Sequence, residues 1–193
     1  AGSETFLNVF IFFLIIAGII LDKMGVRFTA LLSGLVMLIG ATINWYAVTE
    51  MFKGSELERW FTDHLNYIPL FDELGVSPFY RGMPASAKFA AIGFMIFGCG
   101  VEMAGITVSR GIVKWFKGRE MAMAMGSEMA LARLGVATCM IFSPVFAKMY
   151  GITDVSRSAA FGVILLLIAL MMFIVYFFMD KKLDAQTGEE EEK

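Results

Sequence analysis

The sequence predicts an all-α protein, a polytopic membrane bundle with five transmembrane helices. Three observations predict this fold class. Hydrophobic residues make up 58% of the 193 residues, and the mean hydropathy is +0.71. The apolar residues gather in runs of about 20, the length that an α-helix needs to cross a bilayer. The short segments between these runs are basic on one side of the expected membrane only, as cytosolic loops are.

Composition also excludes several classes of function. A net charge of −2 points to no nucleic-acid partner. Cys99 and Cys139 fall inside apolar runs without metal-ligand spacing, and His64 is the single histidine, so we expect no disulfide and no metal site. The sequence contains no phosphate loop, dinucleotide fingerprint or Ser/His/Asp arrangement. We therefore expect neither an enzyme nor a cofactor.

Five apolar runs divide the chain. Very short segments separate the first run from the second and the third from the fourth, so each of these pairs must form an antiparallel hairpin. Residues 1–182 hold the bundle, and residues 183–193, which end in a run of glutamates, are expected to be an acidic cytosolic linker or tail. The expected spans are about 5–21, 28–48, 86–113, 121–149 and 159–179.

The longest break, residues 49–85, is expected to be an outer loop. Ser55 and Glu58 fit a capping box, and the apolar residues that follow recur near helical spacing. Two interpretations stay open for this short amphipathic helix: it lies on the membrane surface, or it packs on its own bundle. We interpret His64 as a surface or packing residue rather than a proton sensor.

Small residues predict close packing between helices, because they let helix backbones approach each other. One stripe recurs every four residues in the fourth span. Several glycines thin the third span. The stripe consists of Ala122, Gly126 and Ala130, and the glycines are Gly93, Gly98, Gly100 and Gly105.

A motif in the first basic hairpin carries a family resemblance. The string GIILDKMGVR holds Gly18, Asp22, Lys23, Gly25 and Arg27. Gly18 is expected to permit the close approach of another helix, and Gly25 is expected to permit a sharp turn. The string resembles the loop after the second helix of major facilitator superfamily transporters, G-x-L-A-D-(R/K)-x-G-(R/K)-(R/K). In that family the loop is a latch that holds the two halves in the outward-facing state.

The resemblance has consequences for the whole chain. Val26 stands where the family prefers a basic residue, which is a departure from the motif. If the motif follows the second helix, the five spans are the second to sixth helices of the N-terminal six-helix domain. We therefore expect the first helix and the C-terminal half of the same transporter to be partners outside this sequence.

Four ionisable residues lie inside the expected spans and away from their outer ends: Glu102, Arg110, Glu128 and Arg133. A charge at the bilayer centre costs about 2.5–3.5 kcal/mol on insertion scales, so such residues usually face a bundle interior or an aqueous cavity. From the helical rise, Glu102 and Arg133 both lie roughly 20 Å from the cytosolic end of their helices. Arg110 and Glu128 lie nearer that end, as a second pair or a gate. The alternative is that both pairs are purely structural.

The surroundings of these charges resemble a narrower group. Gly100-Val-Glu102 precedes the string WFKGRE at residues 115–120, and Ala132-Arg133-Leu-Gly135 follows. Similar elements occur in the major facilitator group that includes the lysosomal dipeptide transporters of animals. There the corresponding Glu and Arg contact substrate, which implies the same roles for Glu102 and Arg133. Arg110 and Glu128 depart from that group, where neutral residues are usual.

The resemblance and the charges together imply a secondary active or facilitative transporter that works by alternating access. The expected substrate is a small zwitterion such as a dipeptide, with Glu102 on the ammonium group and Arg133 on the carboxylate. Two alternatives stay open: a proton-coupled organic anion transporter, and a membrane scaffold that transports nothing. The outer loops lack a glycosylation sequon, which favours a bacterial cytoplasmic membrane over a lysosomal one.

Overall fold

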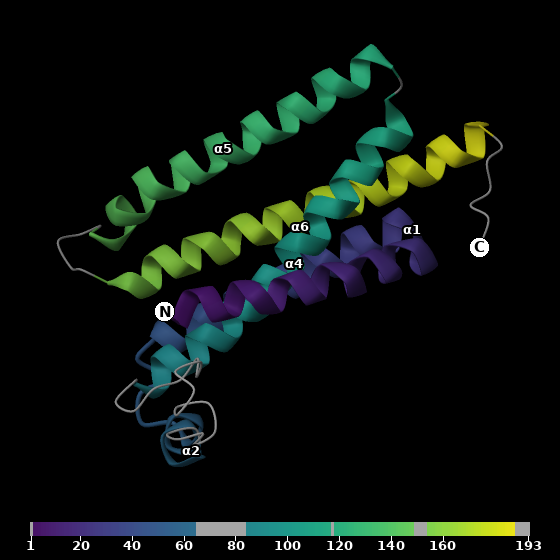
Figure 1. Cartoon of the computed structure of the whole chain (residues 1–193). Helices are drawn as coiled ribbons and strands as arrows, with labels where there is room; N and C mark the ends of the chain where they lie inside the picture. The colour runs from purple at the N-terminus through teal and green to yellow at the C-terminus, as the bar shows by residue number, and fades with distance from the viewer. Residues whose placement is uncertain (1, 65–83, 117, 149–153, 188–193) are drawn as a thin grey trace.

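The computed structural model describes residues 2–64, 84–116, 118–148 and 154–187. All regular structure in these ranges is helical, which confirms the predicted fold class (Figure 1). Within the described residues there are one short helix and four long ones. They are α1 (Gly2–Val48), α2 (Glu56–His64), α4 (Ala85–Trp115), α5 (Arg119–Ala147) and α6 (Val155–Thr187).

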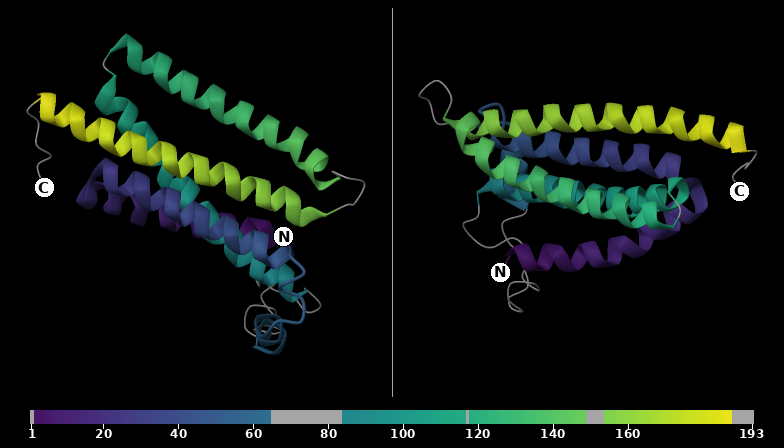
Figure 2. Two further views of the ribbon diagram at one scale, coloured as in Figure 1. Left: turned by 180° about the vertical axis from the view of Figure 1, so that it is seen from behind. Right: turned by 90° about the horizontal axis from the view of Figure 1, so that it is seen from above.

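Helix α1 contains both of the first two expected spans. Its helical backbone is interrupted at Gly25, where φ is 79° and ψ is 165°. Glycine adopts this positive φ without the steric cost that a side chain would add. The chain folds back there, and the two arms of α1 run in opposite directions (Figure 2). The expected hairpin and the role of Gly25 as its turn residue are both confirmed.

Four helices in the described ranges are long and apolar enough to cross a membrane. Because α1 has two arms, these four helices account for the five apolar runs in the sequence. The last helix is longer than expected. Residues 183–187, predicted to begin the acidic tail, continue α6 as far as Thr187. Residues 188–193, the remainder of that tail, lie outside the described residues.

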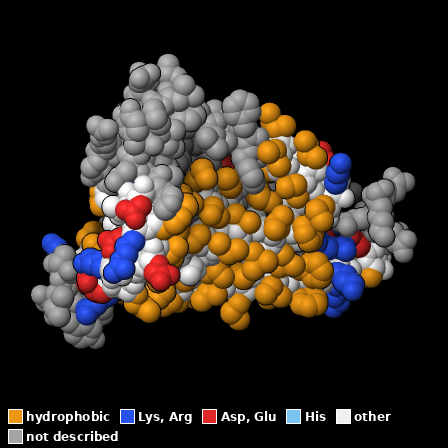
Figure 3. All heavy atoms as spheres, turned by 90° about the horizontal axis from the view of Figure 1, so that it is seen from below, with side chains coloured by type: hydrophobic (Ala, Val, Ile, Leu, Met, Phe, Trp, Pro, Cys, Tyr) orange, Lys and Arg blue, Asp and Glu red, His pale blue; other side chains and the backbone are white. Residues whose placement is uncertain are grey.

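The basic loop ends gather at one end of the bundle. Arg27 follows the turn of α1, Lys114 ends α4, and both contact Asp180 near the end of α6. A broad apolar face occupies the middle of the molecule, with charged side chains gathered towards its two ends (Figure 3). This arrangement suits a bilayer-spanning protein and places the predicted cytosolic segments together.

The closest helix packing joins α1 to α4. A Cβ atom added at Gly40 would lie 2.7 Å from the carbonyl oxygen of Gly93 and would also meet the backbone of Phe97. One added at Gly100 would lie 2.7 Å from the backbone nitrogen of Met37. The expectation that glycines thin the third span is confirmed at Gly93 and Gly100.

The small-residue stripe of α5 does not form such a contact. A Cβ atom added at Gly126 would meet nothing within 4 Å, and the same is true at Gly105 in α4. No residue of α5 whose side chain is described is buried. In Figures 1 and 2, α5 lies at the edge of the bundle. The stripe therefore faces open space rather than a neighbouring helix of the described chain.

Helix α2 begins with half of the predicted capping box, because Ser55 caps Glu58 but the Glu58 side chain bonds to Gly54, one residue before Ser55. The backbone N–H of Glu58 donates to Ser55 Oγ at 3.2 Å, and Glu58 Oε2 accepts from the backbone N–H of Gly54 at 2.5 Å. Phe61 is buried against Phe52 and Phe89, with 5.3 Å between the Phe61 and Phe89 ring centroids. Of the two interpretations, the structure favours a helix packed on its own bundle.

Candidate functional site

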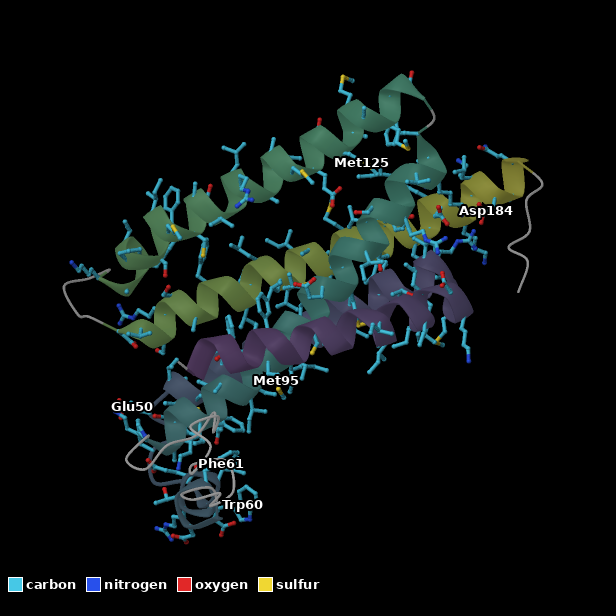
Figure 4. All side chains as sticks on the ribbon, viewed as in Figure 1. Glu50, Trp60, Phe61, Met95, Met125 and Asp184 are labelled. Atoms are coloured by element: carbon cyan, nitrogen blue, oxygen red, sulfur yellow. The ribbon has the colours of Figure 1, made fainter. Side chains whose placement is uncertain are left out.

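One face of α4 forms the wall of a cavity of about 480 Å³. The α4 residues that line it recur at intervals of three, four, seven and eight positions, which places them on one side of a helix. Helix α5 contributes Met125, which Figure 4 labels. We call this space the Glu102 cavity. It is lined by Glu102, Gly105, Ile106, Ser109, Arg110, Val113 and Met125.

Glu102 contributes the negative charge of this wall. Its side chain is half-buried, and it has no ion-pair partner among the residues that the structure describes. Beside it, Gly105 leaves open space where a side chain would stand. The volume of the cavity falls in the range of small-molecule sites, about 300–1,000 Å³.

Arg110 contributes the positive charge of the same wall, about 12 Å from Glu102 along the helix axis. Its Nη2 also donates to Asp22 Oδ1 at 2.5 Å. Both side chains of this ion pair are more than half exposed, at 58% for Arg110 and 64% for Asp22. The predicted pairing of Arg110 with Glu128 is absent from the described ion pairs, and Arg110 is bound to the turn of α1 instead.

The charges of α5 stand apart from this wall. Arg133 is exposed and Glu128 is half-buried, and neither is among the residues that line the Glu102 cavity. Neither has an ion-pair partner within the described ranges. The structure therefore brings Glu102 and Arg110 to one cavity, whereas Arg133 and Glu128 on α5 have no ion pair with any residue that it describes.

A charged group with several hydrogen-bond donors lies at the basic end, and sequence reasoning missed it. Asp180 of α6 is fully buried and accepts hydrogen bonds from Arg27 Nε, Lys114 Nζ and Trp115 Nε1, each at 2.8 Å. Asp184, one turn later, forms ion pairs with both Arg27 and Lys114 (Figure 4). This Asp180 cluster joins the second arm of α1 to the ends of α4 and α6.

A signal for this cluster was present in the sequence. Asp180 and Asp184 are four residues apart, so they lie on one face of a helix. Lys114 and Trp115 stand together at the end of another span. The sequence does not show that those two helices lie side by side, so their charged residues could be assigned only to loops.

The residues of the latch motif have two different environments. Arg27 is engaged within the bundle by Asp180 and Asp184. Asp22 and Lys23 remain exposed at the turn, with Asp22 held by Arg110. A Cβ atom added at Gly18 would meet nothing within 4 Å, so the close approach expected at Gly18 is not formed with the described residues.

A comparison with known proteins gives this geometry a context. The chain is similar to a transporter. It is 28% identical over 171 residues to the lysosomal dipeptide transporter MFSD1 of Danio rerio. The match covers 81% of this chain and 36% of that transporter, so the chain spans about a third of its relative's length. No family model and no solved structure matches the chain.

The zebrafish transporter supports the coarser predictions made from sequence. Together with the apolar helices, the similarity supports the prediction of a multi-pass membrane protein that resembles a transporter of this kind. The similarity to a lysosomal protein of an animal gives no support to the predicted bacterial membrane.

Proposed function

We propose that this chain forms part of the pathway of a secondary transporter that moves small zwitterions, such as dipeptides, by alternating access. The observation that carries the proposal is the Glu102 cavity, which presents a carboxylate and a guanidinium from one helix face. Transporters of this kind bind substrate near the bilayer midplane, in a space between two moving halves. The similarity to a dipeptide transporter supports the same class of substrate.

Glu102 is our proposed ligand for the substrate ammonium group. A half-buried carboxylate without an ion-pair partner in the described chain can accept a cation without first losing one. Leaving such a charge in an apolar membrane interior is costly. A bound ammonium group would offset that cost and orient the substrate by its amino end.

Two arginines are proposed for the substrate carboxylate at successive points of the pathway. Arg133 has the same predicted depth as Glu102 and is free of ion pairs in the described ranges, which suits the midplane position. Arg110 lines the Glu102 cavity nearer the basic end, which suits the cytosolic side of the pathway. Both keep the planar guanidinium that binds a carboxylate through two hydrogen bonds.

Helix α5 supports the proposal that further helices of the same protein complete the pathway. It has no buried residue among its described side chains, yet it carries Glu128, Arg133 and a small-residue stripe. Such a face suits contact with other helices rather than with lipid. We propose that a first helix and a second half cover it, and that this chain alone does not transport.

Blocked and unblocked dipeptides test the assignment. Binding is measured in the full-length protein for Glu102→Gln, Arg133→Ala and the unchanged protein. Loss of a partly desolvated charge contact costs about 2–5 kcal/mol, or tens- to thousands-fold in affinity. Glu102→Gln should lose less for an N-acetylated substrate, and Arg133→Ala less for a C-amidated one, because those contacts are already missing.

The same experiment separates the alternatives. A proton-coupled organic anion transporter would bind N-acetylated substrates as well as free ones, and its transport would follow the pH gradient. A scaffold would bind none of them, and both substitutions would only reduce the amount of folded protein. Equal losses for all dipeptides would remove the zwitterion assignment.

We propose the lysosomal membrane as the location, because the curated relative is a lysosomal transporter.

Asp22 is proposed to act in the latch at the cytosolic side. Asp22→Asn should then lower turnover while leaving Glu102 and its ammonium contact intact. Unchanged turnover would exclude the latch role.

A further inference from the structure

We propose that Arg110 couples occupancy of the Glu102 cavity to the freedom of Asp22. One guanidinium serves two places: it lines the cavity, and it holds the carboxylate of Asp22 at 2.5 Å. The inference rests on the proposed function, because it assumes that a substrate carboxylate enters this cavity.

The geometry leaves Arg110 able to serve both places. A guanidinium has five N–H donors in a fixed plane, and Asp22 accepts from Nη2. The Arg110 side chain remains 58% exposed, and it stands on the helix face that also carries Ser109 and Glu102. Donors therefore remain for a second carboxylate on the cavity side.

Electrostatics makes the two carboxylates compete. Both would share a single positive charge, and two negative groups beside one guanidinium repel each other. Each carboxylate therefore weakens the binding of the other, and thermodynamic linkage requires the effect to be reciprocal. A substrate carboxylate on Arg110 loosens Asp22, and Asp22 reduces the affinity of Arg110 for that carboxylate.

Two other cations at this end are already engaged. Arg27 and Lys114 are both engaged by Asp180 and Asp184 in the Asp180 cluster. Arg110 is thus the basic residue of the cavity wall and also the ion-pair partner of Asp22 in the described chain. When a substrate carboxylate binds Arg110, the carboxylate of Asp22 becomes available to a partner outside this bundle.

Substrate affinity in an Asp22→Asn variant of the full-length protein tests the coupling. Removing the competing charge should raise affinity for a dipeptide with a free carboxylate by about two- to fivefold, the range of an exposed ion pair. Affinity for the C-amidated dipeptide should stay unchanged. The gain should disappear in the Arg110→Gln background, because no shared charge remains.

Glu120→Gln is the matched control, since Glu120 is an exposed carboxylate near the same end with no ion pair in the described ranges. It should leave both affinities unchanged. A second measurement follows the accessibility of the thiol in a Lys23→Cys variant, which should rise when free dipeptide binds and not when amidated dipeptide binds.

The outcomes distinguish this inference from the function beneath it. If the dipeptide binds equally well to the unchanged protein and to Asp22→Asn, the coupling is overturned and the proposed transport function still stands. Equal gains for free and amidated dipeptides also overturn it. Absence of any dipeptide binding to the unchanged protein overturns the proposed substrate and the coupling together.

Discussion

Arg27 Nε donates a hydrogen bond to Asp180 Oδ2 at 2.8 Å, across 153 positions of the sequence. The bond closes the bundle at its basic end, where Lys114 and Trp115 donate to the same carboxylate. Because Asp180 is fully buried, its charge depends on donors within the bundle, which also include the Tyr176 hydroxyl at 3.5 Å. Each of the donors in turn depends on Asp180 for its own position.

Replacing Asp180 with Ala should therefore destabilise the bundle strongly. Removing one partner of a buried ion pair costs about 3–5 kcal/mol, and Arg27 and Lys114 would keep only their ion pairs with Asp184. Thermal unfolding in detergent measures the effect. Lys181→Gln is the control, since Lys181 is exposed and adjacent to Asp180. An Asp180→Ala protein that melts with the control would show that the cluster contributes little.

Gly40→Ala should disturb the contact between α1 and α4. The new Cβ would lie 2.7 Å from the backbone oxygen of Gly93, and a backbone cannot rotate away as a side chain can. Overpacking of this kind costs about 1–3 kcal/mol. Gly126→Ala places the same methyl group in open space on α5, where alanine favours the helix over glycine. Equal stability of the two variants in a detergent unfolding assay would contradict the close packing.

The arrangement of charged ends predicts the labelling of single cysteines. Cysteines at positions 23 and 182 should react from the same side of the membrane, because the turn of α1 and the end of α6 meet in the Asp180 cluster. A cysteine at position 53, at the opposite end of the second arm of α1, should react from the other side. Membrane-impermeant reagents applied to sealed vesicles check this, in a background without Cys99 and Cys139. Positions 23 and 182 on opposite sides would contradict the topology.

Phe61→Ala should release α2 from the bundle while leaving the spans in place. Phe61 is buried against Phe52 and Phe89, and truncating a buried Phe costs about 3–5 kcal/mol. Hydrogen exchange of α2 should become faster, with little change in α4 beyond Phe89. Leu57→Ala is the control, since Leu57 is 44% exposed. Unchanged exchange in Phe61→Ala would instead favour a helix held at the membrane surface.

The long helices and their turns could be predicted from sequence because their causes are local. An apolar run of sufficient length requires a spanning helix, Gly25 permits the turn, and Ser55 with Glu58 begins α2. Each of these features depends on residues close together in the chain. The end of α6 was missed because its last turns are polar, and polar residues beyond a span read equally well as helix or tail.

The ion pairs could not be predicted because they depend on which helix faces which. Depth along the axis suggested Glu128 for Arg110, but depth does not give the rotation of a helix about its axis. Asp22, on the turn of α1, is the partner in the structure. Asp180 and Arg27 lie in the last and first helices of the chain, so only the assembled bundle brings them together.

Because the helices are synthesised in order, Arg27 and Lys114 can act first during membrane insertion and later in the folded bundle. Asp180 and Asp184 belong to the last helix, so the two cations have no acidic partner from α6 while the earlier spans enter the membrane. Before α6 is made, they are positive charges of the kind that retains a loop in the cytosol. Once α6 has been made, the carboxylates neutralise them. Charges that first decide the direction of insertion afterwards hold the inserted helices together.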